Sequence, residues 1–371
     1  MKEEKKRVLE MVEQGKLSAA EALNLLELLE KEGKEEKKLQ LSSSLEKGSA
    51  GSGINPGSQA KQDSLNYKVM AAKDKLFDFV DMALTKIKDS DLDFNFGSSL
   101  DVSYIFQQQD AAFSSILVDV ANGQVDLIPW GSAEVRVECK AKVYRAKEQS
   151  EAVGLFMRDT IFTVENGEFQ FTNSQKWMKI NAKIYVPDTI YEKIKIRLFN
   201  GSFYGEKLQV NELKAKTANG KLTLIRLDGG AAELETANGQ IHLEEAHLRN
   251  LEAETINGSI DITGSCEKAG LHSFSGEISC RINNKDCKRV HAKTTASSIH
   301  IYLPEGTPID GDLKTNLGSF HVNLGGIDVV EEKSEVGKKI LRFKAHELSE
   351  QKMFVLAESM SGSISISRGR E

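Results

Sequence analysis

The chain has 371 residues, of which 40% are hydrophobic and 28% are charged, and its formal net charge is -6. This acidic balance, with no basic patch interleaved with aromatic residues, argues against a nucleic-acid partner. The sequence contains no apolar run of about eighteen residues, and its charged N-terminus leads into no secretory apolar core. We therefore expect a cytoplasmic protein, either free or peripherally attached to the inner face of the membrane.

Residues 1–33 are predicted to form a helical hairpin. Ser18 is placed to cap the second helix, and Glu21 completes a capping box with it. The second helix carries more leucine than one short partner helix can cover, and an isolated hairpin of this length is too small to be stable alone. We expect the hairpin to join copies of the chain into a homo-oligomer or to dock on a protein partner whose identity is unknown. Docking on the chain's own body is the alternative.

Two segments follow the hairpin. Residues 34–63 are rich in Lys and Glu and then in Ser and Gly, which predicts a flexible linker. Residues 64–91 have the periodicity of an amphipathic helix. Its polar face mixes Asp with Lys, whereas a helix at a membrane surface usually has a basic polar face. We expect it to cap an open end of the following domain, with membrane binding as the alternative.

Residues 92–371 are organised by a repeat of the form Thr-x-Asn-Gly-x-apolar-x-apolar. Its clearest copies are Thr217–Leu224, Thr236–Leu243 and Thr255–Ile262, and a degenerate copy has Ser297 at the glycine position. Successive copies between residues 201 and 318 are 18 to 21 residues apart. The predicted repeat turns are Gly123, Gly201, Gly220, Gly239, Gly258, Gly276, Gly318 and Gly362.

A period near twenty residues predicts a solenoid in which each copy is one coil. Apolar and polar residues alternate after the glycine and again before it, so each coil has two short strands with one buried face. We expect the Asn-Gly pair to form the corner, with glycine supplying a positive φ. The predicted fold is mainly β, a parallel β-helix or β-prism. An antiparallel sandwich or meander is the alternative, because Asn-Gly also favours hairpins.

The repeat pauses at residues 129–192. Alternating patterns there predict strands, and Asn166-Gly167 predicts a tight hairpin. We expect this stretch to be an antiparallel insert beside the solenoid.

Three histidines share one outward position of the repeat. His242, His300 and His321 lie three residues after their corner, and Asp261 and Ser279 occupy that position in the coils between His242 and His300. His300 and His321 fall in successive coils, so we expect their side chains to lie about 5 Å apart. This row could bind a cation, but a solvated face without a ligand is the simpler interpretation. We assign no catalytic, cofactor or metal residues and expect no cofactor.

The cysteines Cys139, Cys266, Cys280 and Cys287 form no Cys-x-x-Cys pair. This spacing argues against a zinc ribbon and favours reduced thiols in a cytosolic protein. Cys280 falls at an inward-facing position of its coil.

The hairpin sequence Arg7–Leu23 and the Asn-Gly repeat together resemble the YvlB-like and LiaG-like adhesin-type family of Gram-positive bacteria. The hairpin resembles that family's N-terminal short-helix (SHOCT-like) module, and the repeat resembles its β-solenoid domain. The resemblance brings no catalytic residues and implies a role in the cell-envelope stress response. We predict a non-enzymatic intracellular interaction or scaffold protein. The alternatives are an exported surface adhesin or glycan-binding solenoid and, less favoured, a carbohydrate-active β-helix enzyme, which would need a cluster of carboxylates in a groove.

Overall fold

The computed structural model describes residues 98–335, 337–345 and 352–369. The predicted hairpin (1–33) with its cap residues Ser18 and Glu21, the linker (34–63) and the helix (64–91) lie outside these residues.

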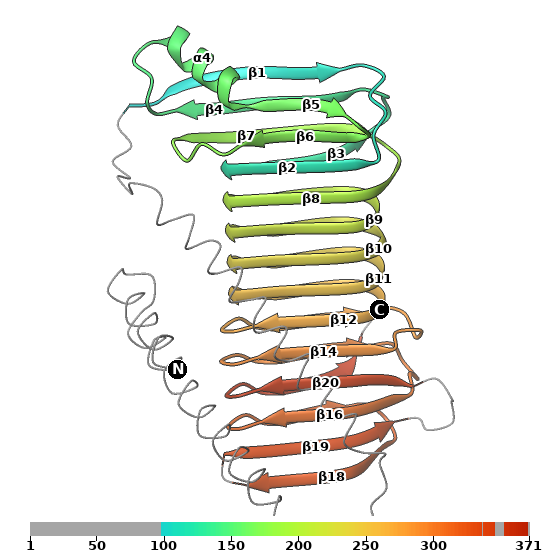
Figure 1. Ribbon diagram of the computed structural model, residues 1–371. Helices are drawn as coiled ribbons and strands as arrows, with labels where there is room; N and C mark the ends of the chain where they lie inside the picture. Colours follow the sequence, from blue (N-terminus) through green and yellow to red (C-terminus); the bar gives the residue numbers. More distant parts are fainter. Residues whose placement is uncertain (1–97, 336, 346–351, 370–371) are drawn as a thin grey trace, which may run out of the picture. The chain divides into compact units, whose positions relative to one another are not determined.

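The described strands form a solenoid with two walls, and each coil contributes one strand to each wall (Figure 1). Strands on either side of a corner glycine therefore belong to different walls. In spatial order, the first wall contains β5 (Ile161–Glu165), β6 (Glu168–Asn173), β2 (Ser115–Asn122), β8 (Ile190–Asn200), the later parts of β9 (Phe203–Asn219), β10 (Leu222–Asn238), β11 (Ile241–Asn257) and β12 (Ile260–Ser273), then β14 (Arg289–Thr294), β20 (Met353–Ser359), β16 (Ile309–Thr315), β19 (Lys338–Ala345) and β18 (Ile327–Glu335). The second wall contains β1 (Leu100–Gln108), β4 (Val135–Val143), β7 (Met178–Pro187), β3 (Val125–Trp130), the early parts of β9 to β12, then β13 (Ile278–Ile282), β15 (Ile299–Leu303), β21 (Ile364–Arg368) and β17 (Phe320–Asn323).

The repeat positions pair in register between coils, as a parallel β-helix requires. Leu222 pairs with Ile241, which pairs with Ile260, and all three side chains are fully buried. The polar residues between the apolar ones point outward, so a shift of one residue would bury them and expose the core. The predicted solenoid is thus confirmed, and the alternative of an antiparallel meander through the repeats is wrong.

The spatial order of the coils differs from their chain order at both ends of the stack (Figure 1). The last coil, β20 with β21, lies between the coil of β14 and β15 and the coil of β16 and β17. The first coil, β2 with β3, likewise lies between β6 with β7 and β8 with β9. The first and last coils in chain order are therefore each held between two other coils, whereas β1, which precedes the first coil, lies at the edge of the second wall.

Residues 129–192 are only partly antiparallel. β4 pairs antiparallel with β1 and β7, and β5 and β6 form the predicted hairpin, with Asn166 and Gly167 at φ 52° and 76°. Strands β6 and β7, however, pair parallel with the first coil and make a coil of their own. The stretch also contains the helix α4 (Gln149–Asp159), which the alternating pattern did not predict. No helix of the described residues has the length and apolarity to cross a membrane.

Aromatic side chains fill the end of the core beneath α4. Phe156 of α4 is fully buried, and its ring centroid lies 6.0 Å from that of Phe106 in β1. Phe106 also stacks on Phe162 of β5, with ring centroids 5.3 Å apart. At the other end, the antiparallel hairpin of β18 and β19 covers β16. Antiparallel strands thus end the first wall at both sides, as terminal caps do in other repeat proteins.

The corner glycines serve a purpose different from the predicted one. Among the predicted turn glycines only Gly123 has a positive φ, of 123°. At Gly201, Gly220, Gly239, Gly258, Gly276, Gly318 and Gly362, a Cβ atom would lie 1.6 to 2.0 Å from a backbone oxygen of the neighbouring coil. These corners need glycine because adjacent coils approach too closely for any side chain, so the prediction of a left-handed corner was wrong for them.

Two side-chain ladders reinforce the corners. The hydroxyl of Thr236 donates to the carbonyl oxygen of Gly220 at 3.1 Å, and Thr255 repeats this bond to Gly239. The amide nitrogen of each ladder asparagine donates to the amide oxygen of the asparagine in the preceding coil, at 2.7 to 3.0 Å, through Asn122, Asn200, Asn219, Asn238 and Asn257. The Thr and Asn of the repeat are therefore contacts between coils.

Replacing Gly239 with Ala should destabilise the solenoid strongly. The new Cβ would lie 1.9 Å from the carbonyl oxygen of Gly220, so the backbones of two coils must separate. We expect a loss of at least about 3 kcal/mol, because a backbone cannot yield as a side chain does. Gly131→Ala is the matched control, since nothing lies within 4 Å of its Cβ position. Thermal unfolding followed by circular dichroism measures both variants, and equal melting temperatures would contradict the account.

Candidate functional site

The outward side chains of the first wall form a continuous charged surface, which we call the charged face. Because the coils pair in register, outward residues at one repeat position stand in a column across strands. From β9 to β16 the charged face contains Lys214, Lys216, Glu233, Glu235, Glu252, Glu254, His272, His291, Lys293, Glu358, Asp312 and Lys314.

Lysines and glutamates pair at the β9–β10 step of the charged face. The Nζ atom of Lys216 lies 2.9 Å from Glu233 and 2.7 Å from Glu235, and Lys214 lies 2.9 Å from Glu233. Burial alone would raise the pKa of Glu233, but its hydrogen bonds with Glu235 and the two lysines lower it to about 2. Burial raises the pKa of Glu235, so this carboxyl takes up a proton before Glu233 does.

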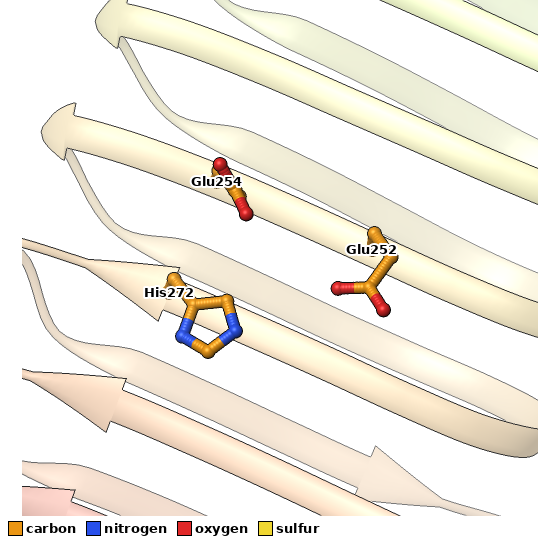
Figure 2. Close-up of side chains that lie close together, drawn as sticks. All are labelled: Glu252, Glu254 and His272. Atoms are coloured by element: carbon orange, nitrogen blue, oxygen red, sulfur yellow. The ribbon is translucent and has the colours of Figure 1, made fainter. Parts of the chain in front are cut away.

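A cluster of three potential metal ligands lies two steps further along, between β11 and β12. Figure 2 shows Glu252 and Glu254 on β11 and His272 on the neighbouring strand β12. One ligand atom from each of these residues lies within 4.8 Å of the others. The position opposite Glu252 on β12 is Gly270, and a Cβ atom there would lie 2.2 Å from Oε2 of Glu252. The missing side chain therefore leaves room for this carboxylate.

Two histidines meet beside this cluster. The ring centroids of His272 and His291 lie 4.9 Å apart, with the rings nearly perpendicular. Burial lowers the pKa of both rings, and that of His272 falls to about 3. Both imidazoles are consequently neutral at pH 7, which is the form that binds metal ions.

The row of histidines predicted as an outward column lies on the second wall. Nδ1 of His242 lies 3.1 Å from Asp261, as the shared repeat position implies. Because the last coil lies between theirs, His300 and His321 both pair with Ser365 and are not in successive coils. The expected spacing of about 5 Å between these two histidines is therefore wrong, since two strand spacings separate them.

The structure brings together residues that the sequence analysis did not select. The predicted histidine row occupies an outward position after the corner glycine, whereas Glu254 and His272 both lie four residues before that glycine. Comparing that position between neighbouring coils would have placed the two residues side by side. Predicting that the ring of His291 lies close to that of His272 would also have required knowledge of the side-chain rotamers.

The four cysteines are free and buried. Burial raises the pKa of Cys139 to about 12 and also raises that of Cys280, so both remain thiols. An open depression of about 280 Å³ lies over the β5–β6 hairpin, lined by Thr163, Glu165, Asn166, Glu168 and Gln170. These residues supply no nucleophile with an adjacent base.

A family model described as Toastrack DUF4097 matches residues 113–367, which span the solenoid. The chain belongs to this family. A second model, described as a SHOCT-like domain, matches residues 3–34, in agreement with the predicted resemblance of the N-terminal segment. The chain is also 44% identical over 366 residues to the uncharacterized protein YvlB of Bacillus subtilis (strain 168), covering 99% of both chains.

Several solved structures are more distantly similar. A candidate adhesin from Parabacteroides distasonis is 12% identical with a TM-score of 0.38, covering 73% of this chain and 98% of that one. A candidate adhesin from Bacteroides fragilis is 11% identical with a TM-score of 0.36, covering 71% of this chain and 97% of that one. At these scores the names describe those proteins alone, and the function of this chain has to be inferred from its own residues.

The burial of His272 should make stability fall in mild acid. Because the pKa of His272 is about 3 in the folded chain and about 6.5 when unfolded, protonation favours unfolding. This contribution is complete above pH 6.5 and is lost as pH falls toward 3, by at most about 1.4 kcal/mol per pH unit. The melting temperature of His272→Gln should therefore decline less steeply from pH 7 to pH 4. His247→Gln, which alters an exposed ring, is the control, and parallel curves for all three proteins would contradict the prediction.

Proposed function

We propose that this protein is a non-enzymatic interaction scaffold of the bacterial cytoplasm that acts in the cell-envelope stress response, either free or at the inner face of the membrane. The charged face is the observation that carries the proposal. Its ion pairs connect neighbouring coils, as Lys216 does with Glu233 and Glu235 and as Lys314 does with Glu358 at 3.0 Å. A stack hydrogen-bonded at every strand presents such a surface in a rigid arrangement, which suits binding of a large partner.

Other features support parts of the proposal. Free buried thiols are typical of proteins in a reducing compartment, which favours the cytoplasm. The relation to YvlB-like proteins is what suggests the stress response. The SHOCT-like segment at residues 3–34 supports assembly of several copies through the N-terminus.

One experiment in the native bacterium tests location and assembly together. Intact cells are treated with external protease, washed, cross-linked with a lysine-reactive reagent and fractionated. We expect the 41.0 kDa chain to survive the protease and to form cross-linked multiples that disappear when residues 1–33 are deleted. Cross-links to other proteins should be lost with Lys214→Glu on the charged face and kept with Lys183→Glu on the second wall.

Two results would contradict the proposal. Cleavage of the protein on intact cells would exclude the cytoplasmic scaffold and favour an exported adhesin or glycan-binding protein. Protection without any cross-linked species would place the chain inside the cell but remove its role as a scaffold.

A further inference from the structure

The cluster of Glu252, Glu254 and His272 has the composition and spacing of a metal site. Two carboxylates on one strand and one imidazole on the next are ligand types that Zn²⁺ and related divalent ions bind. Their ligand atoms already lie within 4.8 Å of one another. A tetrahedral zinc ion with bonds of about 2.0 Å holds its ligands roughly 3.3 Å apart. The ligand atoms would therefore have to move closer together by about 1.5 Å or less on binding zinc.

Gly270 leaves space for the carboxylate of Glu252, one of the potential ligands. Glycine in the middle of a strand is unfavourable unless something must approach the backbone closely. Here the carboxylate of Glu252 occupies the space above Gly270, where a Cβ would lie 2.2 Å from Oε2 and 2.8 Å from Cδ. The glycine lies on β12 two residues before His272, so the carboxylate is brought next to the imidazole.

His291 offers a fourth ligand. It pairs with Gly270 from the opposite side, so Glu252 and His291 flank the same glycine. Its ring centroid is 4.9 Å from that of His272.

The charge of the neighbouring coils favours a cation on this side. In the register of β10 and β11, Glu233 lies opposite Glu252 and Glu235 lies opposite Glu254. Four carboxylates are thus placed on two adjacent strands. Lys214 and Lys216 contact the carboxylates of β10 from the β9 side. On the β12 side, the residues paired with Glu252 and Glu254 are Gly270 and His272. A divalent cation bound there would contact the carboxylates of Glu252 and Glu254 directly.

We propose that Glu252, Glu254 and His272, with His291 as a further ligand, form a binding site for one divalent transition-metal ion of the Zn²⁺ type. The site tightens the contact between the coils of β11 and β12 and does not depend on the scaffold function proposed above.

Isothermal titration of the full chain with ZnCl₂ in a non-chelating buffer at pH 7 tests the site. We expect saturable binding of one ion per chain and a zinc-dependent rise in melting temperature. Glu252→Gln and His272→Gln should each weaken binding by at least about tenfold. Gly270→Ala should weaken it too, because the new methyl group displaces the carboxylate of Glu252 although all four ligand residues are still present.

Two matched variants serve as controls. His247→Gln removes an exposed histidine and Glu245→Gln removes an exposed carboxylate that pairs with Arg226, and both should bind zinc as the unaltered chain does. Circular dichroism before titration confirms that each variant is folded. The proposal is overturned if the unaltered chain shows no saturable zinc binding, or if Glu252→Gln, His272→Gln and Gly270→Ala all bind as tightly as the controls.

Discussion

Adjacent coils touch through their backbones at the corners, and this contact determines the rest of the structure. At the Gly220–Gly239 contact, the carbonyl oxygen of one coil lies 1.9 Å from where the next coil would place a Cβ. The hydroxyl of Thr236 donates to that same oxygen. The Thr and the Gly of the repeat thus both contact this carbonyl oxygen. The Thr hydroxyl donates a hydrogen bond to it, and the Gly leaves space for it because it has no Cβ. Because the corner cannot accept a side chain, each coil can stack on the next in one register only.

The fixed register determines which charged side chains lie next to one another on the outer surface. Residues that occupy one repeat position become neighbours at one strand spacing, about 4.8 Å. Like charges in such a column repel unless opposite charges or a bound ion lie beside them. At the Glu233–Glu235 pair the lysines of β9 supply that charge. Two coils further, on β12, Gly270 and His272 occupy the corresponding positions beside Glu252 and Glu254, and this step of the charged face offers potential metal ligands.

Much of the fold follows from the sequence because the repeat encodes it locally. The alternation around Thr236–Leu243 specifies which side chains are buried, and the period specifies the coil. The position of the last coil could not be predicted this way. Its corner at Gly362 suits any neighbouring coil equally well, and what places it between the corners of Ser297 and Gly318 is the long excursion through β18 and β19. The error about His300 and His321 came from assuming that chain order is stacking order.

The candidate site could be predicted from the sequence only in part, because the repeat places Glu254 beside His272 but does not mark these residues as a site. Glu252, Glu254 and His272 lie at ordinary solvent-facing positions of a strand, where charged residues are common. Only the pairing of β11 with β12 shows that Gly270 makes space for Glu252, and only the side-chain positions show that His291 lies beside His272. Helix α4 was missed because its burial depends on two residues, Ala152 and Phe156, which gives a weak periodic signal.

The most direct measurement of the central claim is amide hydrogen exchange at the corners of the stack. The amides of Gly220 and Gly239 donate to Asn238 and Asn257 of the neighbouring coil at 3.0 Å, although such positions are turns in the chain. If close contact of the corners holds the coils together, these amides should exchange as slowly as those of the buried strands, because they open only when coils separate. Fast exchange at the corners, with protection confined to the strands, would show that the corners are ordinary exposed turns and would contradict the account.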